Sequence, residues 1–395
     1  SSNGLEKRPK LRFPGFDEPY VLHRIGDIYA ERSERGAADM ELLSVTMNGG
    51  VMQRSEIEGK DNSSEDKSNY KVVRKGDMVY NSMRMWQGAN GVSPYDGIVS
   101  PAYTVLTAKL PICNEYFAAL FKNYKLINEF KKNSQGMTSD TWNLKYPQIK
   151  TIKVYLPRVT EQEKVASLLV TLDKRIAAQA TLVEQLKKYK RGVMQRIFRN
   201  MSAVSPSGFE TVQLSAIFKK VSRRNNKSEI KNVITNSAEY GLIPQRDFFD
   251  KDIAVDGNTS NYYVIEQGDF VYNPRKSNTA PYGPFNRYER EERGIISPLY
   301  TCLVLQADIE PSYLAWYFKS DAWYRYIYDN GSQGVRHDRV SMTDGLLMGI
   351  PVIIPSKEAQ LKIAKLLDCL ESRFQTELSQ YESLKSIRVA LLQQL

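Results

Sequence analysis

The chain has 395 residues, of which 42% are hydrophobic and 25% charged, and its formal net charge at pH 7 is +10. This length exceeds one ordinary core and predicts two or more domains, and the composition excludes a largely disordered protein. The basic excess favours an anionic partner, either nucleic acid or a membrane surface.

Targeting segments and the spacing of cysteines indicate the cellular compartment of a protein. No run of about 18 apolar residues is present to span a bilayer, and residues 1–10 lack the apolar core of a signal peptide. Cys113, Cys302 and Cys369 are too far apart to indicate a disulfide framework or a zinc ribbon. We therefore expect a cytoplasmic protein with no membrane partner.

Two stretches of the chain have nearly the same sequence, "VVRKGDMVYN" at 72–81 and "VIEQGDFVYN" at 264–273. Each predicts a short strand, a Gly-Asp turn and a second strand that ends in Tyr-Asn. "GIVSPAYTVL" from Gly97 recurs as "GIISPLYTCL" from Gly294, and Pro157 recurs as Pro355. Because the order is kept, we expect a tandem duplication of a mixed α/β globule.

Polar loops follow both repeated strands. The first loop, "NSMRMWQGANG", supplies Arg84, Trp86, Gln87 and Asn90, and the second, "NPRKSNTAPYG", supplies Arg275, Lys276 and Asn278. Arg suits guanine edges, and Asn or Gln suits adenine edges, in the major groove of DNA. A solvated loop is the alternative for any single residue, but the parallel placement favours DNA reading.

Further candidates lie in a second pair of loops and in two basic runs. The loops "NSQGMTSDTWN" and "NGSQGVRHDRVSM" supply Gln135, Thr138, Gln333, Arg336 and His337, which could equally cap the preceding helices. The run at 219–231 contains Arg223, Arg224 and Lys227, and a second basic run covers 187–199. Such runs attract phosphates without reading sequence, and a solvated helix face is the alternative for the second run.

A helical pattern follows each of the two equivalent prolines. The apolar positions step by four and three in both copies, as in a heptad seam: Val165, Leu169, Leu172, Ile176, Val183, Leu186, Val193 and Ile197, then, 198 residues later, Ile363, Leu367, Leu370, Phe374, Tyr381, Leu384, Leu391 and Leu395. The first helix would be about 58 Å long. Since one such helix cannot bury its own seam, we expect an antiparallel pair with an approximate two-fold axis.

Polar seam positions also match between the copies, Gln179 with Glu377 and Lys190 with Arg388. They could fix the register of the helices or extend into solvent.

The predicted domains are a first globule at 1–158, a long helix at 159–199, a linker and second globule at 200–356, and a second long helix at 357–395.

Catalytic motifs are absent from the sequence. There is no G-x-S-x-G, H-E-x-x-H or phosphate-binding glycine motif, and His23 and His337 are the only histidines. We therefore expect no catalytic residue, metal site or cofactor in this chain.

The helix starts "LPRVTEQEKVASLLVTLDKRI" from Leu156 and "IPSKEAQLKIAKLLDCLESRF" from Ile354 resemble the two helical regions of specificity subunits of type I restriction-modification systems. The segment from Val233 resembles a target-recognition domain of that family. Ala359 departs from the pattern, because the first copy has Glu161 at the equivalent position.

The resemblance implies a non-catalytic bacterial or archaeal subunit that reads a split, asymmetric target in double-stranded DNA. Its implied partners are methyltransferase subunits, expected as two copies, which use S-adenosylmethionine to methylate adenine. Restriction subunits that use ATP and Mg would join them. Two alternatives stay open: a coiled-coil scaffold with protein-binding globules, and a self-contained methyltransferase or nuclease.

Overall fold

The computed structural model describes residues 7, 9, 11–36, 39–47, 49–59, 63–139, 141–248, 259–331 and 338–394. Its contacts divide the chain into two compact units. The first contains Ser1–Ala180 and Ser379–Leu395, and the second contains Thr181–Leu378. The division cuts across the expected domain boundaries, because each long helix contributes to both units.

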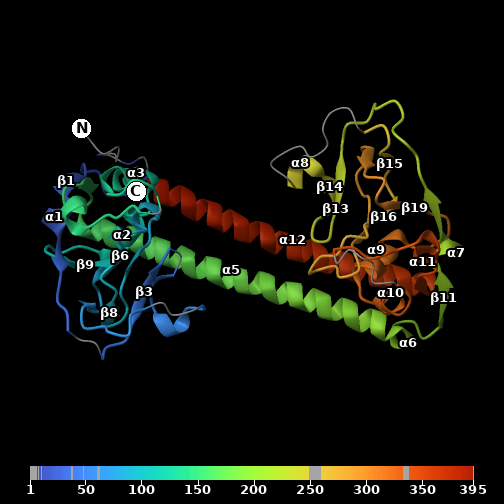
Figure 1. Cartoon of the computed structure of the whole chain (residues 1–395), viewed down its shortest axis with the longest axis horizontal. Coiled ribbons are helices and arrows are strands. Elements are labelled where there is room, and N and C mark those ends of the chain that lie inside the picture. The colour runs from blue at the N-terminus through green and yellow to red at the C-terminus, as the bar shows by residue number, and fades with distance from the viewer. Residues whose placement is uncertain are drawn as a thin grey trace. The chain divides into compact units, whose positions relative to one another are not determined.

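The first unit combines short antiparallel strands with short helices (Figure 1). Its four-stranded sheet has the order β2-β9-β6-β7, and the remaining strands form the pairs β1-β10, β3-β4 and β5-β8. The strands are β1 (Val21–Arg24), β2 (Tyr29–Arg32), β3 (Leu43–Thr46), β4 (Gly50–Gln53), β5 (Lys71–Val73), β6 (Met78–Asn81), β7 (Asn90–Val92), β8 (Gly97–Val99), β9 (Tyr103–Ala108) and β10 (Lys153–Leu156). The short helices are α1 (Ile25–Ile28), η1 (Arg54–Glu56), η2 (Met85–Gln87), α2 (Asn114–Leu120), α3 (Tyr124–Asn133) and α4 (Tyr146–Ile149).

The second unit repeats this topology. Its four-stranded sheet has the order β12-β19-β16-β17, beside the pairs β11-β20, β13-β14 and β15-β18. The strands are β11 (Phe209–Gln213), β12 (Phe218–Val221), β13 (Ile234–Ser237), β14 (Gly241–Pro244), β15 (Tyr263–Ile265), β16 (Phe270–Tyr272), β17 (Phe285–Arg287), β18 (Gly294–Ile296), β19 (Thr301–Leu305) and β20 (Pro351–Pro355). The short helices are α6 (Met201–Val204), α7 (Leu214–Ile217), α8 (Gln245–Phe248), α9 (Pro311–Lys319), α10 (Tyr324–Asn330) and α11 (Asp344–Met348). The matching strand orders confirm the predicted duplication of a mixed α/β globule.

Aromatic side chains fill both cores. In the first unit, Phe117 meets Tyr29 and Phe121 edge to face, with ring centroids 5.3 and 6.0 Å apart. In the second unit, Phe285 stacks on Phe318 at 4.0 Å. Such pairs add to the free energy of burial. Most of the aromatic segment at 313–328 is therefore core, as its density predicts, although Tyr328 is 70% exposed.

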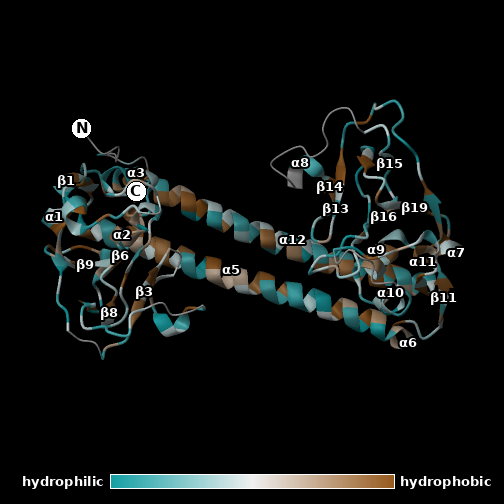
Figure 2. Ribbon diagram, in the orientation of Figure 1, coloured by the Kyte–Doolittle hydropathy of each residue, from teal (hydrophilic) through white to brown (hydrophobic). Residues whose placement is uncertain are grey.

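The long helices are α5 (Val159–Arg199) and α12 (Lys357–Gln394). Within the first unit α5 begins and α12 ends, and within the second unit α5 ends and α12 begins. Because a segment of each helix lies beside the other in both units, the paired segments run in opposite directions. Every described seam position is buried or half-buried, and Figure 2 shows hydrophobic bands recurring along both helices. The predicted heptad seam is confirmed for these residues.

Each paired segment carries an ion pair at equivalent positions of the repeat. In the first unit Arg388 Nη2 lies 3.0 Å from Asp173 Oδ2, and in the second unit Lys190 pairs with Glu371. Asp173 and Glu371 are 198 residues apart, as are Lys190 and Arg388. The polar seam positions Lys190 and Arg388 therefore bind the opposite helix rather than extending freely into solvent.

A buried glutamine holds the start of each long helix to its globule. Gln162 Nε2 donates to the Pro157 carbonyl at 3.0 Å, and Gln360 Nε2 donates to the Pro355 carbonyl at 2.9 Å. Their side-chain oxygens accept from backbone N–H groups of the globules, Cys113 at 3.1 Å and Glu310 at 2.9 Å. Hydrogen bonds at both ends of the amide allow these polar side chains to be buried.

Candidate nucleic-acid interface

The repeated Gly-Asp sequence builds the same turn in both units. Gly76 and Gly268 have φ of 93° and 94°, in the left-handed region that glycine adopts without strain. One residue later, Asp77 Oδ2 accepts the backbone N–H of Arg74 at 2.8 Å, and Asp269 Oδ2 accepts that of Glu266 at 2.9 Å. The turn fixes where β6 and β16 begin.

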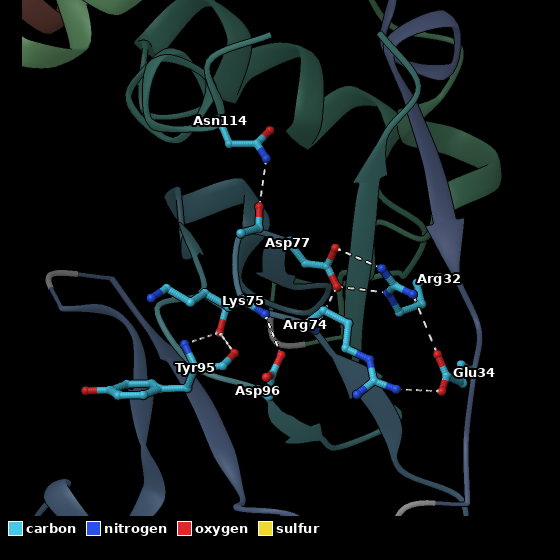
Figure 3. A network of polar contacts seen from close by, with 10 residues as sticks. Arg32, Glu34, Arg74, Lys75, Asp77, Tyr95, Asp96 and Asn114 are labelled. Atoms are coloured by element: carbon cyan, nitrogen blue, oxygen red, sulfur yellow. Dashed lines mark hydrogen bonds and ion pairs between the residues drawn. The ribbon is translucent and has the colours of Figure 1, made fainter. Parts of the chain in front are cut away.

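An arginine at the end of β2 anchors the turn of the first unit (Figure 3). Arg32 Nε donates to Asp77 Oδ2 at 2.9 Å, and Arg32 Nη1 also lies 3.6 Å from Glu34 Oε2. Asn114 Nδ2 donates to the Gly76 carbonyl at 2.7 Å. The Asp77 side chain is only 7% exposed, so this ion pair belongs to the scaffold.

Arg223 fills the same role in the second unit, which corrects its assignment as a DNA contact. It pairs with Asp269 and, at 3.1 Å, with Glu266. Two carboxylates therefore engage this guanidinium inside the unit, and we remove Arg223 from the candidate contacts. Burial raises the pKa of the Asp269 carboxyl, although its backbone hydrogen bond and the charge of Arg223 oppose the rise.

The asparagine after each repeated strand turns the chain into the candidate loop. Asn81 Oδ1 accepts from the Met83 N–H, and Asn273 Oδ1 accepts from the Arg275 N–H, both at 3.0 Å. Such side-chain turns mimic a backbone turn and stabilise the chain reversal. Both loops therefore leave a buried sheet strand at a defined point.

The first loop forms one wall of an open cleft of about 660 Å³. The cleft is lined by Leu42, Leu43, Ser44, Arg54, Ser63, Tyr70, Asn81, Met83, Arg84, Trp86, Ser100, Ala102, Tyr103 and Ser139. Arg84 is exposed, and its Nη1 donates to Gln87 Oε1 at 3.3 Å. Trp86 packs edge to face against Trp142 with centroids 5.3 Å apart, and its Nε1 donates to the Met83 carbonyl. The loop thus presents an exposed guanidinium, and the Trp86 side chain of the same loop is held by Trp142.

Asn90 does not belong to this surface. It lies in β7 with 1% exposure, and its Nδ2 donates to the Gly88 carbonyl at 3.0 Å. A side chain enclosed by the globule cannot reach a base edge, so we remove Asn90 from the candidate contacts. Close packing of β7 on β4 encloses it, because a Cβ on Gly91 would lie 2.9 Å from the Gly50 Cα.

The second loop borders a cleft of about 520 Å³ in the other unit. The cleft is lined by Lys276, Ser277, Asn278, Pro281, Tyr282, Ile327, Tyr328, Gly331, Asp338 and Val340. Arg275, Lys276 and Asn278 are all exposed. The backbone of Arg275 pairs with that of Arg339, and the Lys276 N–H donates to the Asp338 carbonyl at 2.9 Å. Backbone bridging holds this loop beside residues 338–340.

Two tyrosines that sequence reasoning missed lie beside the loops. Tyr103 and Tyr70 line the first cleft, and their repeat equivalents are Tyr300 and Tyr262. Burial raises the pKa of the Tyr300 hydroxyl, while the nearby Thr235 and the charges of Arg275 and Arg339 oppose the rise. The repeat offset itself is the signal that could have identified these pairs.

The remaining predicted DNA contacts lie in different local surroundings. Gln135 is exposed and its backbone pairs with Asn143, while Thr138 is exposed in a tight turn with Thr141. Arg224 Nη1 donates to Asn261 Oδ1 at 3.2 Å, and the Lys227 side chain is 83% exposed. Gln333, Arg336 and His337 lie outside the described residues.

The described ranges contain neither a candidate metal centre nor a membrane-spanning helix. Within them, no group of three or more His, Cys, Asp or Glu residues could hold a metal ion. Over the same part of the chain, no helix is both long and apolar enough to cross a bilayer.

Comparison with known proteins identifies the first of these loop-bearing units. Residues 31–188 match the family described as the type I restriction modification DNA specificity domain. Over these residues, the chain is similar to that family. The specificity domain match covers the first globule and most of α5.

Two curated specificity subunits from Methanocaldococcus jannaschii share part of this sequence. The putative type I restriction enzyme MjaX specificity subunit is 25% identical over 147 residues, which are 35% of this chain and 34% of the relative. The type I restriction enzyme MjaVIII specificity subunit is 29% identical over 130 residues, which are 32% of this chain and 29% of the relative. The chain thus aligns with about a third of the length of these relatives.

Solved structures match the fold over nearly the whole chain. The S subunit of a type I restriction-modification system from M. genitalium has a TM-score of 0.54 at 14% identity and 98% coverage of both chains. The HsdS subunit from Thermoanaerobacter tengcongensis has a TM-score of 0.53 at 16% identity, covering 98% of this chain and 97% of that one. The chain therefore shares the fold of these subunits.

Proposed function

We propose that this chain is the sequence-recognition subunit of a type I restriction-modification system. Each unit reads one half of a split, asymmetric target in double-stranded DNA. The carrying observation is that both units project an exposed, cationic loop from an Asn-capped sheet strand. The match of residues 31–188 to the type I restriction modification DNA specificity domain supports this proposal.

The first loop suits direct readout of DNA. A guanidinium can form two parallel hydrogen bonds with the O6 and N7 of guanine. Arg84 is exposed, and Trp86 of the same loop packs against Trp142, which supports an ordered loop. In the second unit, Arg275 stands beside Arg339, and Lys276 and Asn278 line the adjoining cleft.

Catalysis belongs to partner subunits in this proposal. Two methyltransferase subunits that bind S-adenosylmethionine modify adenine, and restriction subunits that use ATP and Mg cleave unmodified DNA. Leu168 and Leu366 are repeat equivalents on the long helices, and they are 43% and 47% exposed. Paired exposed leucines of this kind support two equivalent contacts for one type of partner.

The direct test is single-molecule sequencing of adenine methylation in the native host, with and without this gene. We expect methylation to disappear at one split motif, which would also reveal both half-sites. If restored expression in a deletion strain changes no motif, while the methyltransferase subunit is produced, the chain does not direct methylation.

The half-site assignment is tested by Arg84→Ala and Arg275→Ala. If each arginine contacts a base, each change should cost about 1–3 kcal/mol in binding and relax only its own half of the motif. The measurement is methylation of a plasmid library in which each half-site is randomised. Arg175→Ala removes an exposed arginine on α5 away from the loops and should leave the motif unchanged. Unaltered specificity in either loop variant removes that arginine from the reading surface.

A further inference from the structure

Three cations on the surface of α5 have no carboxylate partner. Lys187, Lys188 and Arg191, called here the α5 basic strip, are all exposed and lie in the second unit. Over the residues that the structure describes, none has a carboxylate oxygen within 4.0 Å. Lys187 and Arg191 are four residues apart, where like charges destabilise a helix.

The repeat provides an internal comparison for this strip. The equivalent residues of α12, 198 positions later, are Lys385, Ser386 and Val389. Lys385 pairs with Glu382 at 3.0 Å, and Val389 is an apolar side chain with 57% exposure. At the equivalent positions of α12 the charge is therefore paired or absent.

The strip extends to the cleft of the second unit. Arg191 is close enough to Tyr324 for its charge to oppose the rise that burial causes in the pKa of that hydroxyl. Tyr324 packs on Tyr282 with ring centroids 5.0 Å apart, and Tyr282 lines the cleft together with Lys276. Two packed tyrosines therefore lie between the α5 basic strip and the cleft that the candidate reading loop borders.

We propose that the α5 basic strip binds phosphates of the DNA that flanks the half-site read by the second unit. This inference rests on the proposed function. Lysine is depleted from protein–protein interfaces, whereas Lys and Arg contacts to phosphate supply most of the sequence-independent affinity for DNA. A nucleic-acid backbone fits the strip better than an acidic protein surface. The equivalent surface of α12 in the first unit makes no such contact.

The test compares two double variants of the full chain. Lys187→Ala with Arg191→Ala removes two strip charges, and Lys174→Ala with Arg175→Ala removes two exposed charges from the first-unit part of the same helix. Binding to a random-sequence duplex of about 40 base pairs is measured by fluorescence anisotropy at several salt concentrations. The slope of log K against log salt should decrease in magnitude by ~1–2 for the strip variant. It should stay unchanged for the control.

The experiment distinguishes failure of the proposed function from failure of the strip assignment. If the unaltered chain does not bind the duplex at low salt, the proposed function fails and this inference fails with it. If the unaltered chain binds with a steep salt slope and both double variants share that slope, only the strip assignment is overturned. Loss of methyltransferase-subunit binding with an unchanged DNA slope would also overturn it, because the strip would then contact protein.

Discussion

The two units share their internal supports but differ at the start of their long helices. In the first unit Glu161 is 1% exposed and accepts two hydrogen bonds from Arg12, at 2.9 and 2.7 Å. In the second unit the equivalent residue is Ala359, which is 6% exposed. The Gln162 and Gln360 contacts are nevertheless the same in both. The comparison shows that the second helix start is positioned without a buried carboxylate, while the Glu161 ion pair ties Arg12 to the start of α5 in the first unit.

The largest loss of stability is expected from substitutions at Glu161 and Ala359, where the two units differ. Glu161→Ala leaves the Arg12 guanidinium, 13% exposed, without its carboxylate and should destabilise the first unit by about 3 kcal/mol. Ala359→Glu should destabilise the second unit at least as much, because it buries a carboxylate where no arginine is placed. Hydrogen exchange followed by mass spectrometry measures the two units separately.

Glu358→Ala is the matched control for these changes. Glu358 pairs with Lys362, but both side chains are at least 75% exposed, and such surface pairs contribute little. No measurable change in stability is expected. A stable Ala359→Glu variant would show that the second unit has room for a charge, and would remove the proposed distinction.

A smaller difference in stability cost between the two units is expected for substitutions in the Gly-Asp turns. Asp77→Asn should cost about 2–3 kcal/mol, because Arg32 is only 23% exposed and keeps only the longer, 3.6 Å contact with Glu34. Asp269→Asn should cost about 1 kcal/mol, because Arg223 is 37% exposed and keeps Glu266. Urea unfolding, monitored through hydrogen exchange in β6 and β16, measures both. Equal costs would show that exposure of the arginine does not decide the strength of the pair.

The smallest effects are expected at the two helix ion pairs. Lys190→Met should cost about 1–2 kcal/mol and Arg388→Met about 0.5–1 kcal/mol. The first pair is the more buried one, with Lys190 20% and Glu371 29% exposed. In the second pair, Arg388 is 30% and Asp173 47% exposed. Burial by itself raises the pKa of Glu371, but hydrogen bonds from Gln375 and Lys190 bring that pKa below its ordinary value.

Because the pKa of Glu371 is lowered, the effect of Lys190→Met on the unfolding free energy should depend on pH. The stability that Glu371 contributes is present above its unfolded pKa and is lost as the pH falls through its folded pKa. The difference in unfolding free energy between the wild type and Lys190→Met should therefore shrink as the carboxylate is protonated. Denaturation at neutral and acidic pH measures it, and a difference that grows in acid would contradict the assigned pair.

Local patterns predicted the repeat and the helices well, because seam periodicity depends only on nearby residues. They failed at single loop residues. Arg223 stands in a basic run, but Asp269 and Glu266, more than forty positions away, engage its charge. Asn90 stands in a polar loop sequence, but packing of β7 against β4 encloses it. Burial and pairing of one side chain depend on distant partners, which the sequence of the loop does not specify.

The division of the chain also bears on how it folds during synthesis. Thr181–Leu378 is one continuous segment and contains all of the second unit. The first unit also includes residues 379–395, and Asn123 Nδ2 donates to the Leu392 carbonyl at 3.1 Å. Closing a contact across 269 residues is slow compared with local pairing. The globule that leaves the ribosome first is therefore the last to acquire its full set of contacts.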